Sequence, residues 1–174
     1  MWGWLKRKKK QSWVCRVCGQ VHDEFPTDFG WLLPDEIWAL GEEVRKEKLD
    51  WATDVCFHED RWFIRGVLEV PFNFHPGRWG WGVWAEVDHS VVQKLWALGD
   101  SDGSEEPRES GVLACTIPLF PDSMGLPLEV QFGPGDKRPL FYMPADCHHQ
   151  LALEQRLGLD EPGYHRVLEA VTSR

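Results

Sequence analysis

With 174 residues, the chain has the length of one domain and can bury a hydrophobic core without disulfides. Its net charge of −9 combines five cations within residues 1–10 with −14 over the rest, and so acidic a body argues against nucleic acid or an anionic membrane surface as partner. A run of about 18 apolar residues is absent, which excludes a membrane-spanning helix.

We interpret residues 1–12 as a basic, disordered leader and residues 13–174 as a single α+β domain. The five cysteines form an odd set, and the first residues lack the apolar stretch of a secretory signal. We therefore expect a reducing, cytoplasmic location, where thiols serve as metal ligands, reactive groups or core residues.

The first predicted elements are a short strand over residues 13–19 and, after a loop, a helix from Pro34 to about Lys48. Alternating apolar residues over 61–70 and 79–87 predict two long strands that pair as a hairpin. We expect the tryptophans of the second strand to pack in the core rather than to stack on a ligand.

An amphipathic helix follows over residues 89–98, with Asp88 or Ser90 at its N-cap, and residues 100–111 form a polar loop. This order of elements predicts an α+β fold with a mostly antiparallel sheet of five or six strands, flanking helices and an amino-terminal segment like a zinc knuckle. The remaining predicted elements are strands over 112–117, 128–132 and 139–143 and helices over 149–157 and 161–172.

The motif Cys15-x-x-Cys18-Gly19, with His22 close behind, has the spacing of half a zinc site. A two-residue gap aims both sulfurs at one point, and the glycine supplies the left-handed backbone that the turn requires. The sequence therefore predicts a structural zinc ion.

The other zinc ligands must come from distant sequence, because the chain has no second pair of this kind. Cys15, Cys18, His22 and Cys56 are the first choice, and His149 is the rival for the fourth position. Two other interpretations of the thiols stay open: a redox centre at Cys15 and Cys18, or packing in the core, which we expect of Cys115.

A second group of polar and aromatic side chains is predicted on one face of the sheet: Arg65, Glu69, Trp84 and Glu86. Charges beside a large aromatic ring can form a recognition surface. The alternative is a face of ion pairs covered by loops.

Several motifs in order resemble a bacterial family catalogued as domain of unknown function 2199. The resemblance implies no activity, but it adds weight to Cys15, Cys18, His22, Cys56 and His149 and lowers that of His58, Cys147 and His148. One departure is Gln150, where the family usually has proline. The motifs are Cys15-x2-Cys18-Gly19-x2-His22, Asp54-Val-Cys56, Phe63-Ile-Arg65-Gly66-x-Leu-Glu69-x-Pro71, Gly82-Val-Trp84 and His149-Gln-Leu-Ala-Leu-Glu154-Gln155.

We therefore expect a zinc-containing domain that acts by binding rather than by catalysis, with a protein among its candidate partners. One alternative is a thiol-redox or metal-dependent enzyme that uses Cys15 and Cys18. Another is an acidic, immunity-like protein that masks a basic partner, as the charge of the body permits.

Overall fold

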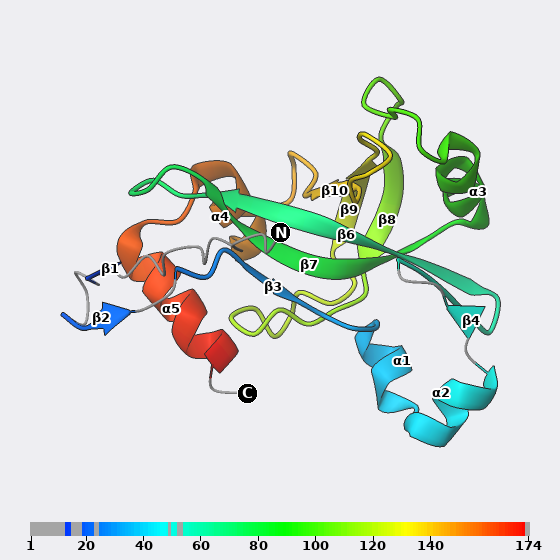
Figure 1. Cartoon of the computed structure of the whole chain (residues 1–174), viewed down its shortest axis with the longest axis horizontal. Helices are drawn as coiled ribbons and strands as arrows, with labels where there is room; N and C mark the ends of the chain where they lie inside the picture. The colour runs from blue at the N-terminus through cyan, green and yellow to red at the C-terminus, as the bar shows by residue number, and fades with distance from the viewer. Residues whose placement is uncertain (1–12, 15–18, 23–24, 49, 52–53, 173–174) are drawn as a thin grey trace, which may run out of the picture.

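The computed structural model describes residues 13–14, 19–22, 25–48, 50–51 and 54–172, so the predicted leader lies outside the described residues. Within this part, Figure 1 shows a curved sheet with helices around it. The helices are α1 (Asp35–Ala39), α2 (Glu42–Lys48), α3 (His89–Leu98), α4 (Gln150–Leu157) and α5 (Glu161–Thr172). The strands are β1 (Trp13–Val14), β2 (Val21–His22), β3 (Asp28–Gly30), β4 (Asp50–Trp51), β5 (Val55–His58), β6 (Arg61–Pro71), β7 (Arg78–Val87), β8 (Glu109–Leu113), β9 (Pro127–Gln131) and β10 (Leu140–Tyr142).

The long antiparallel hairpin of β6 and β7 is the centre of the fold, as the alternating pattern predicts. Its register runs from Trp62 opposite Val87 to Pro71 opposite Arg78. Ile64, Leu68 and the residues between them alternate as in an extended strand. Both strands carry fully buried side chains, so the hairpin is covered on its apolar face.

The sheet is mostly antiparallel, as predicted, but larger than the five or six strands expected. Among the described residues it has eight strands in the order β3-β7-β8-β9-β10-β6-β5-β4. Because β7 also pairs with β6, the five strands β6 to β10 close into a barrel. Two pairings are parallel, β3 with β7 and β10 with β6.

The extra strands are short, which is why the sequence pattern does not reveal them. β3, β4 and β5 have two to four residues each, too few for a period of two to stand out. β3 and β5 exist because β7 and β6 are long enough to hold two partners each along their outer edges, and β4 pairs in turn with β5. On β6, β5 pairs with residues 61–64 and β10 with residues 67–68.

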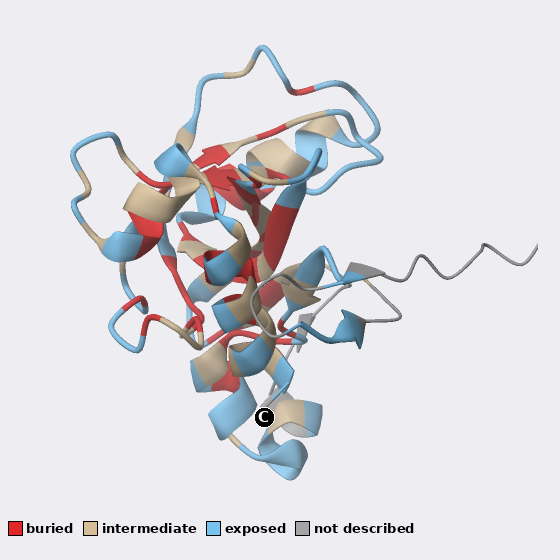
Figure 2. Ribbon diagram, turned by 90° about the vertical axis from the view of Figure 1, so that its left-hand side faces the viewer, coloured by how far each residue is buried: buried red, intermediate tan, exposed pale blue. Residues whose placement is uncertain are grey.

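Aromatic side chains fill much of the core, and the expected burial of the tryptophans is confirmed. Trp79, Trp81 and Trp84 are all at most 1% exposed. Tyr164 from α5 joins them and donates a hydrogen bond of 2.7 Å from its hydroxyl to the carbonyl oxygen of Pro26. Figure 2 shows buried residues concentrated on the strands, while the helices keep exposed outer faces.

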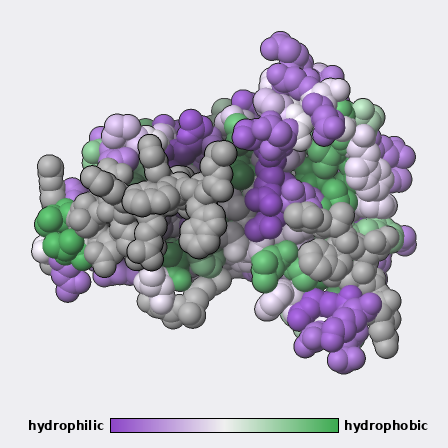
Figure 3. Space-filling model, viewed as in Figure 1, coloured by the Kyte–Doolittle hydropathy of each residue, from purple (hydrophilic) through white to green (hydrophobic). Residues whose placement is uncertain are grey.

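The helices agree with the sequence prediction except near residue 41. Instead of one helix from Pro34 to Lys48, α1 and α2 are separated at Gly41, whose φ of +77° cannot continue a helix. The predicted helices at 89–98, 149–157 and 161–172 are confirmed as α3, α4 and α5. Figure 3 shows hydrophilic surface over α2 and over the loop after α3.

Among the described residues, none of the helices is both long enough and apolar enough to cross a bilayer.

Gly66 on β6 gives a test of how tightly the barrel is packed. A Cβ atom at this position would lie 2.4 to 2.7 Å from ring atoms of Phe141, which is fully buried. We expect Gly66→Ala to lower the free energy of unfolding by about 1–3 kcal/mol, because the ring has no space to move into. Urea denaturation measures the change.

Gly133→Ala is the matched control, since no heavy atom lies within 4 Å of the added Cβ. It should change the free energy of unfolding by less than about 0.5 kcal/mol. In a protein that already carries Phe141→Leu, Gly66→Ala should cost less stability than it does in the parent, because the ring that the added Cβ would meet is gone. Equal stability of the two alanine variants would contradict this account of the packing.

Candidate functional site

The predicted zinc-knuckle segment lies between two described strands. β1 and β2 are antiparallel, with Trp13 opposite His22 and Val14 opposite Val21. Gly19 has a φ of +71°, the left-handed backbone that the motif requires. Cys15 and Cys18 lie outside the described residues, and of His22 only the backbone is described.

The structure does not bring Cys56 to this hairpin. Cys56 lies in β5, opposite Phe63, and its side chain is fully buried. β5 pairs with β4, and Figure 1 shows β4 at the opposite end of the molecule's longest axis from β1 and β2. In this arrangement Cys56 lies far from the described strands of the hairpin, β1 and β2.

His149, the rival ligand, caps helix α4. Its Nδ1 accepts a hydrogen bond of 3.1 Å from the backbone N–H of Leu151. The proton of the neutral ring is then on Nε2, which lies 3.0 Å from Oδ1 of Asp122 and donates to it. Both ring nitrogens are engaged, so a metal at His149 would have to replace one of these bonds.

The other thiols and imidazoles give no alternative site. In the part of the chain that the structure describes, no three His, Cys, Asp or Glu side chains are grouped so that they could hold a metal. Cys115 is fully buried, as expected of a core residue, and burial raises the pKa of its thiol to about 12. A thiol in that state is a poor nucleophile at neutral pH.

The predicted recognition surface must be corrected, because its members do not share an open face. Trp84 is fully buried, and its indole N–H donates to the carbonyl oxygen of Trp31 at 3.3 Å. Glu86 accepts two hydrogen bonds from Arg61, of 2.7 and 2.5 Å, and these hold the pKa of its carboxyl below the ordinary value. Trp84 is therefore closed to a partner, and Glu86 is already paired with Arg61.

Arg65 and Glu69 instead line a groove at the point where β6 changes partners. The backbone N–H of Arg65 donates to Asp54, which precedes β5, and that of Val67 donates to Pro139, which precedes β10, both at 2.9 Å. These two contacts mark the place where β5 ends and β10 begins along the edge of β6. The groove encloses about 670 Å³ and is lined by Asp54, Arg65, Val67, Glu69, Leu95, Gly133, Pro134, Gly135, Asp136, Lys137, Arg138, Pro139 and Leu140.

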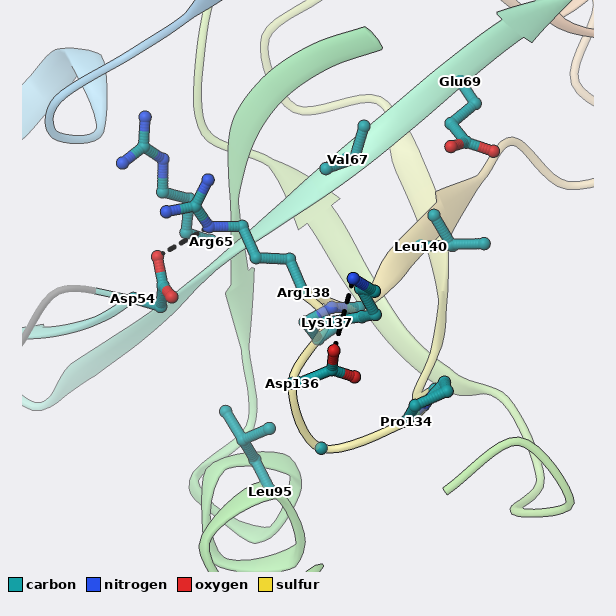
Figure 4. A pocket seen from close by; sticks show the side chains of 13 residues that line it. Asp54, Arg65, Val67, Glu69, Leu95, Pro134, Asp136, Lys137, Arg138 and Leu140 are labelled. Atoms are coloured by element: carbon teal, nitrogen blue, oxygen red, sulfur yellow. Dashed lines mark hydrogen bonds and ion pairs between the residues drawn. The ribbon is translucent and has the colours of Figure 1, made fainter. Parts of the chain in front are cut away.

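Two guanidinium groups lie side by side at one end of this groove (Figure 4). Arg138 donates from Nε to Asp54 at 2.8 Å, whereas Arg65 has no ion pair and a buried Nε without a hydrogen-bond partner among the described residues. Burial and, next, the charge of Arg138 lower the pKa of Arg65. Among the described residues, the two guanidinium groups therefore share one nearby carboxylate, that of Asp54, which is bound to Arg138.

The rest of the groove combines an apolar wall with acidic groups. Leu95 from α3, Val67 and Leu140 supply the apolar surface. Glu69 is bound to Arg78, and Asp136 lies 3.3 Å from the ammonium of Lys137. Sequence analysis found Arg65 and Glu69 by their places on β6. It named Asp54 only within the motif Asp54-Val-Cys56, with no role at this site, and it missed Arg138, which follows a predicted turn.

The capping role of His149 makes a prediction that separates it from a metal ligand. His149→Ala should lower the free energy of unfolding by about 1 kcal/mol, the usual cost of losing an N-cap. His149→Asn should restore most of the loss, because asparagine also caps helices well. Thermal unfolding followed by circular dichroism measures both.

His148→Ala is the matched control, since His148 is the exposed neighbour in sequence. It should change stability little, and all three variants should keep the metal content of the parent protein. Loss of metal in His149→Ala and His149→Asn alone would contradict the capping role and place His149 among the ligands.

Comparison with known proteins identifies the family. No curated protein and no solved structure matches the chain. A family model described as "Uncharacterized protein conserved in bacteria (DUF2199)" matches residues 14–159, which include the cysteine pair and the groove. The chain therefore belongs to this bacterial family, DUF2199.

Proposed function

We propose that this protein acts by binding and that its amino-terminal hairpin holds a structural zinc ion. The observation that carries the metal proposal is the antiparallel pairing of β1 and β2 on either side of the cysteine pair, with Gly19 at φ +71°. A thiolate pair in a turn of this kind suits the tetrahedral preference of zinc. The cytoplasmic location expected from the sequence would keep both thiols reduced.

The ligands that we propose first are Cys15, Cys18 and His22, which are close together in the sequence. β2 ends at His22, opposite Trp13, so this residue lies on the strand that follows the cysteine pair in sequence. Cys56 and His149 remain candidates for the fourth position, although either would have to leave its present surroundings.

The difficulty of supplying a fourth ligand favours a second candidate function. Three protein ligands with one open position are typical of catalytic zinc, in which the metal activates a bound water. The same hairpin would then belong to a metal-dependent enzyme. A cobalt-substituted protein distinguishes the two, because exogenous thiolate changes the visible spectrum only where a position is open.

The zinc proposal predicts about one equivalent of zinc in protein purified without added metal. Cys15→Ser and Cys18→Ser should each lose most of it, because the thiolate is the ligand. If the ion contributes about 2 kcal/mol, the loss should lower Tm by roughly 4–8 °C in a chain of this length. Elemental analysis and thermal unfolding measure these effects.

Cys147→Ser is the control, since this half-buried thiol lies in the turn before α4 and should keep both zinc and stability. Cys56→Ser should lose stability through the core but keep zinc. Zinc-free parent protein would refute the metal proposal, and zinc lost in Cys56→Ser would place Cys56 in the ligand set.

A further inference from the structure

We propose that the groove between β5 and β10 binds the carboxylate of a small organic acid between Arg65 and Arg138. This inference rests on the proposed binding role and not on the zinc ion. The groove is built from described residues of β6, α3 and the 133–140 segment, and it contains none of the proposed metal ligands.

The charge of Arg65 is the first argument. Within the described part of the chain, every other arginine of this region has an acidic or carbonyl partner: Arg61 binds Glu86, Arg78 binds Glu69 and Arg138 binds Asp54. Among the described residues, Arg65 is half-buried beside Arg138 and has no hydrogen bond or ion pair of this kind, and the nearby charge of Asp54 is already bound to Arg138. Burying a guanidinium next to another costs free energy, and a bound anion would offset that cost.

The backbone around Arg65 holds this arrangement in place. A Cβ atom on Gly30 would lie 3.0 Å from Nη2 of Arg65, so the glycine in β3 leaves the space that the guanidinium occupies. The lowered pKa of Arg65, caused by burial and then by Arg138, agrees with a site kept for a negative charge.

The acidic groups of the groove select the type of anion. Asp54, Glu69 and Asp136 line the same space, and they repel a doubly charged phosphate more than a singly charged carboxylate. The negative body of the protein acts in the same direction against polyanions. A carboxylate also matches the planar, two-pronged donor geometry of a guanidinium.

The apolar wall and the size of the groove indicate that the acid has an organic body. Val67, Leu95 and Leu140 offer surface to a hydrocarbon group. The volume of about 670 Å³ lies within the range of sites for small molecules. The turn at residues 133–136 closes one side, and Gly135 there lies against the backbone of Asp100.

Benzoate is a suitable probe, because it joins one carboxylate to an apolar ring. In a titration followed by ¹H–¹⁵N NMR, we expect saturable shifts at residues 65–69 and 133–140 with a Kd below about 10 mM. Benzamide, which has the same shape without the charge, should bind at least about tenfold more weakly. Inorganic phosphate should not compete at equal concentration.

Arg65→Gln and Arg138→Gln should each weaken benzoate binding by about tenfold or more, since each removes a charged donor. Lys46→Gln is the control: its ammonium pairs with Glu42 on the exposed face of α2, and it should leave the affinity unchanged. Arg65→Gln should unfold at or above the Tm of the parent, because it breaks no ion pair and removes a repulsion. Arg138→Gln provides the test if Arg65→Gln does not fold.

The proposal is overturned if benzoate gives no saturable shifts, if benzamide binds equally well, or if phosphate displaces benzoate. It is also overturned if both arginine variants bind like the parent. Zinc content measured on the same preparations distinguishes the two proposals, because benzoate binding by zinc-free protein would refute the metal proposal alone. Chemical conversion of benzoate in the NMR sample would contradict the proposal that the protein acts by binding rather than by catalysis.

Discussion

The pairing of β6 with β7 is the constraint on which the rest of this fold depends. Ten consecutive residue pairs join the two strands, and each of the two is longer than any neighbouring strand. A strand of this length must satisfy the backbone groups of its outer edge along its whole course. It does so with two short partners instead of one long one, and the change of partner occurs on β6 between residues 64 and 67.

This change of partner explains both the barrel and the groove. Beyond it, β10 and then β9 and β8 lead round to β7 and close the ring, while β5 and β4 continue in the other direction. Gly66 lies at the change and lets the ring of Phe141 approach β6, which a side chain would prevent. Arg65 lies beside it, where Asp54 and Pro139 bind the edge of β6, and all three residues line the groove. The groove is thus a consequence of how the sheet divides.

The sequence was informative where one element is long enough to show its own period. β6, β7, α3 and α5 were predicted nearly to the residue, since each presents an apolar face over ten or more positions. β3, β4 and β5 were missed because strands of two to four residues have no period, and they are ordered by the edges of longer strands. Gly41 was overlooked as a break because the apolar spacing continues across it.

The candidate site was predicted less completely, for a related reason. Arg65 and Glu69 were found from their alternation on β6, but alternation alone left open whether the face that they were expected to share with Trp84 is exposed or covered. The opposite strand shows only that Trp84 lies across from Arg65, and whether the face is covered depends on β3 and the loop at Trp31. Arg138 reaches Asp54 across 84 positions of sequence, a contact set by the parallel pairing of β10 with β6. No local pattern contains that information.

The arrangement of the two candidate sites limits the functions that the protein can combine. The hairpin of β1 and β2 lies at the opposite end of the longest axis from β4 and α3, and α3 supplies Leu95 to the groove. A zinc ion in that hairpin would therefore not polarise a ligand held by Arg65 and Arg138. Metal-dependent chemistry would have to occur at the hairpin, with its own substrate contacts. A structural zinc ion in the amino-terminal segment requires no substrate contacts of its own, because recognition would take place in the groove. For this reason the proposed binding role accounts for more of the structure.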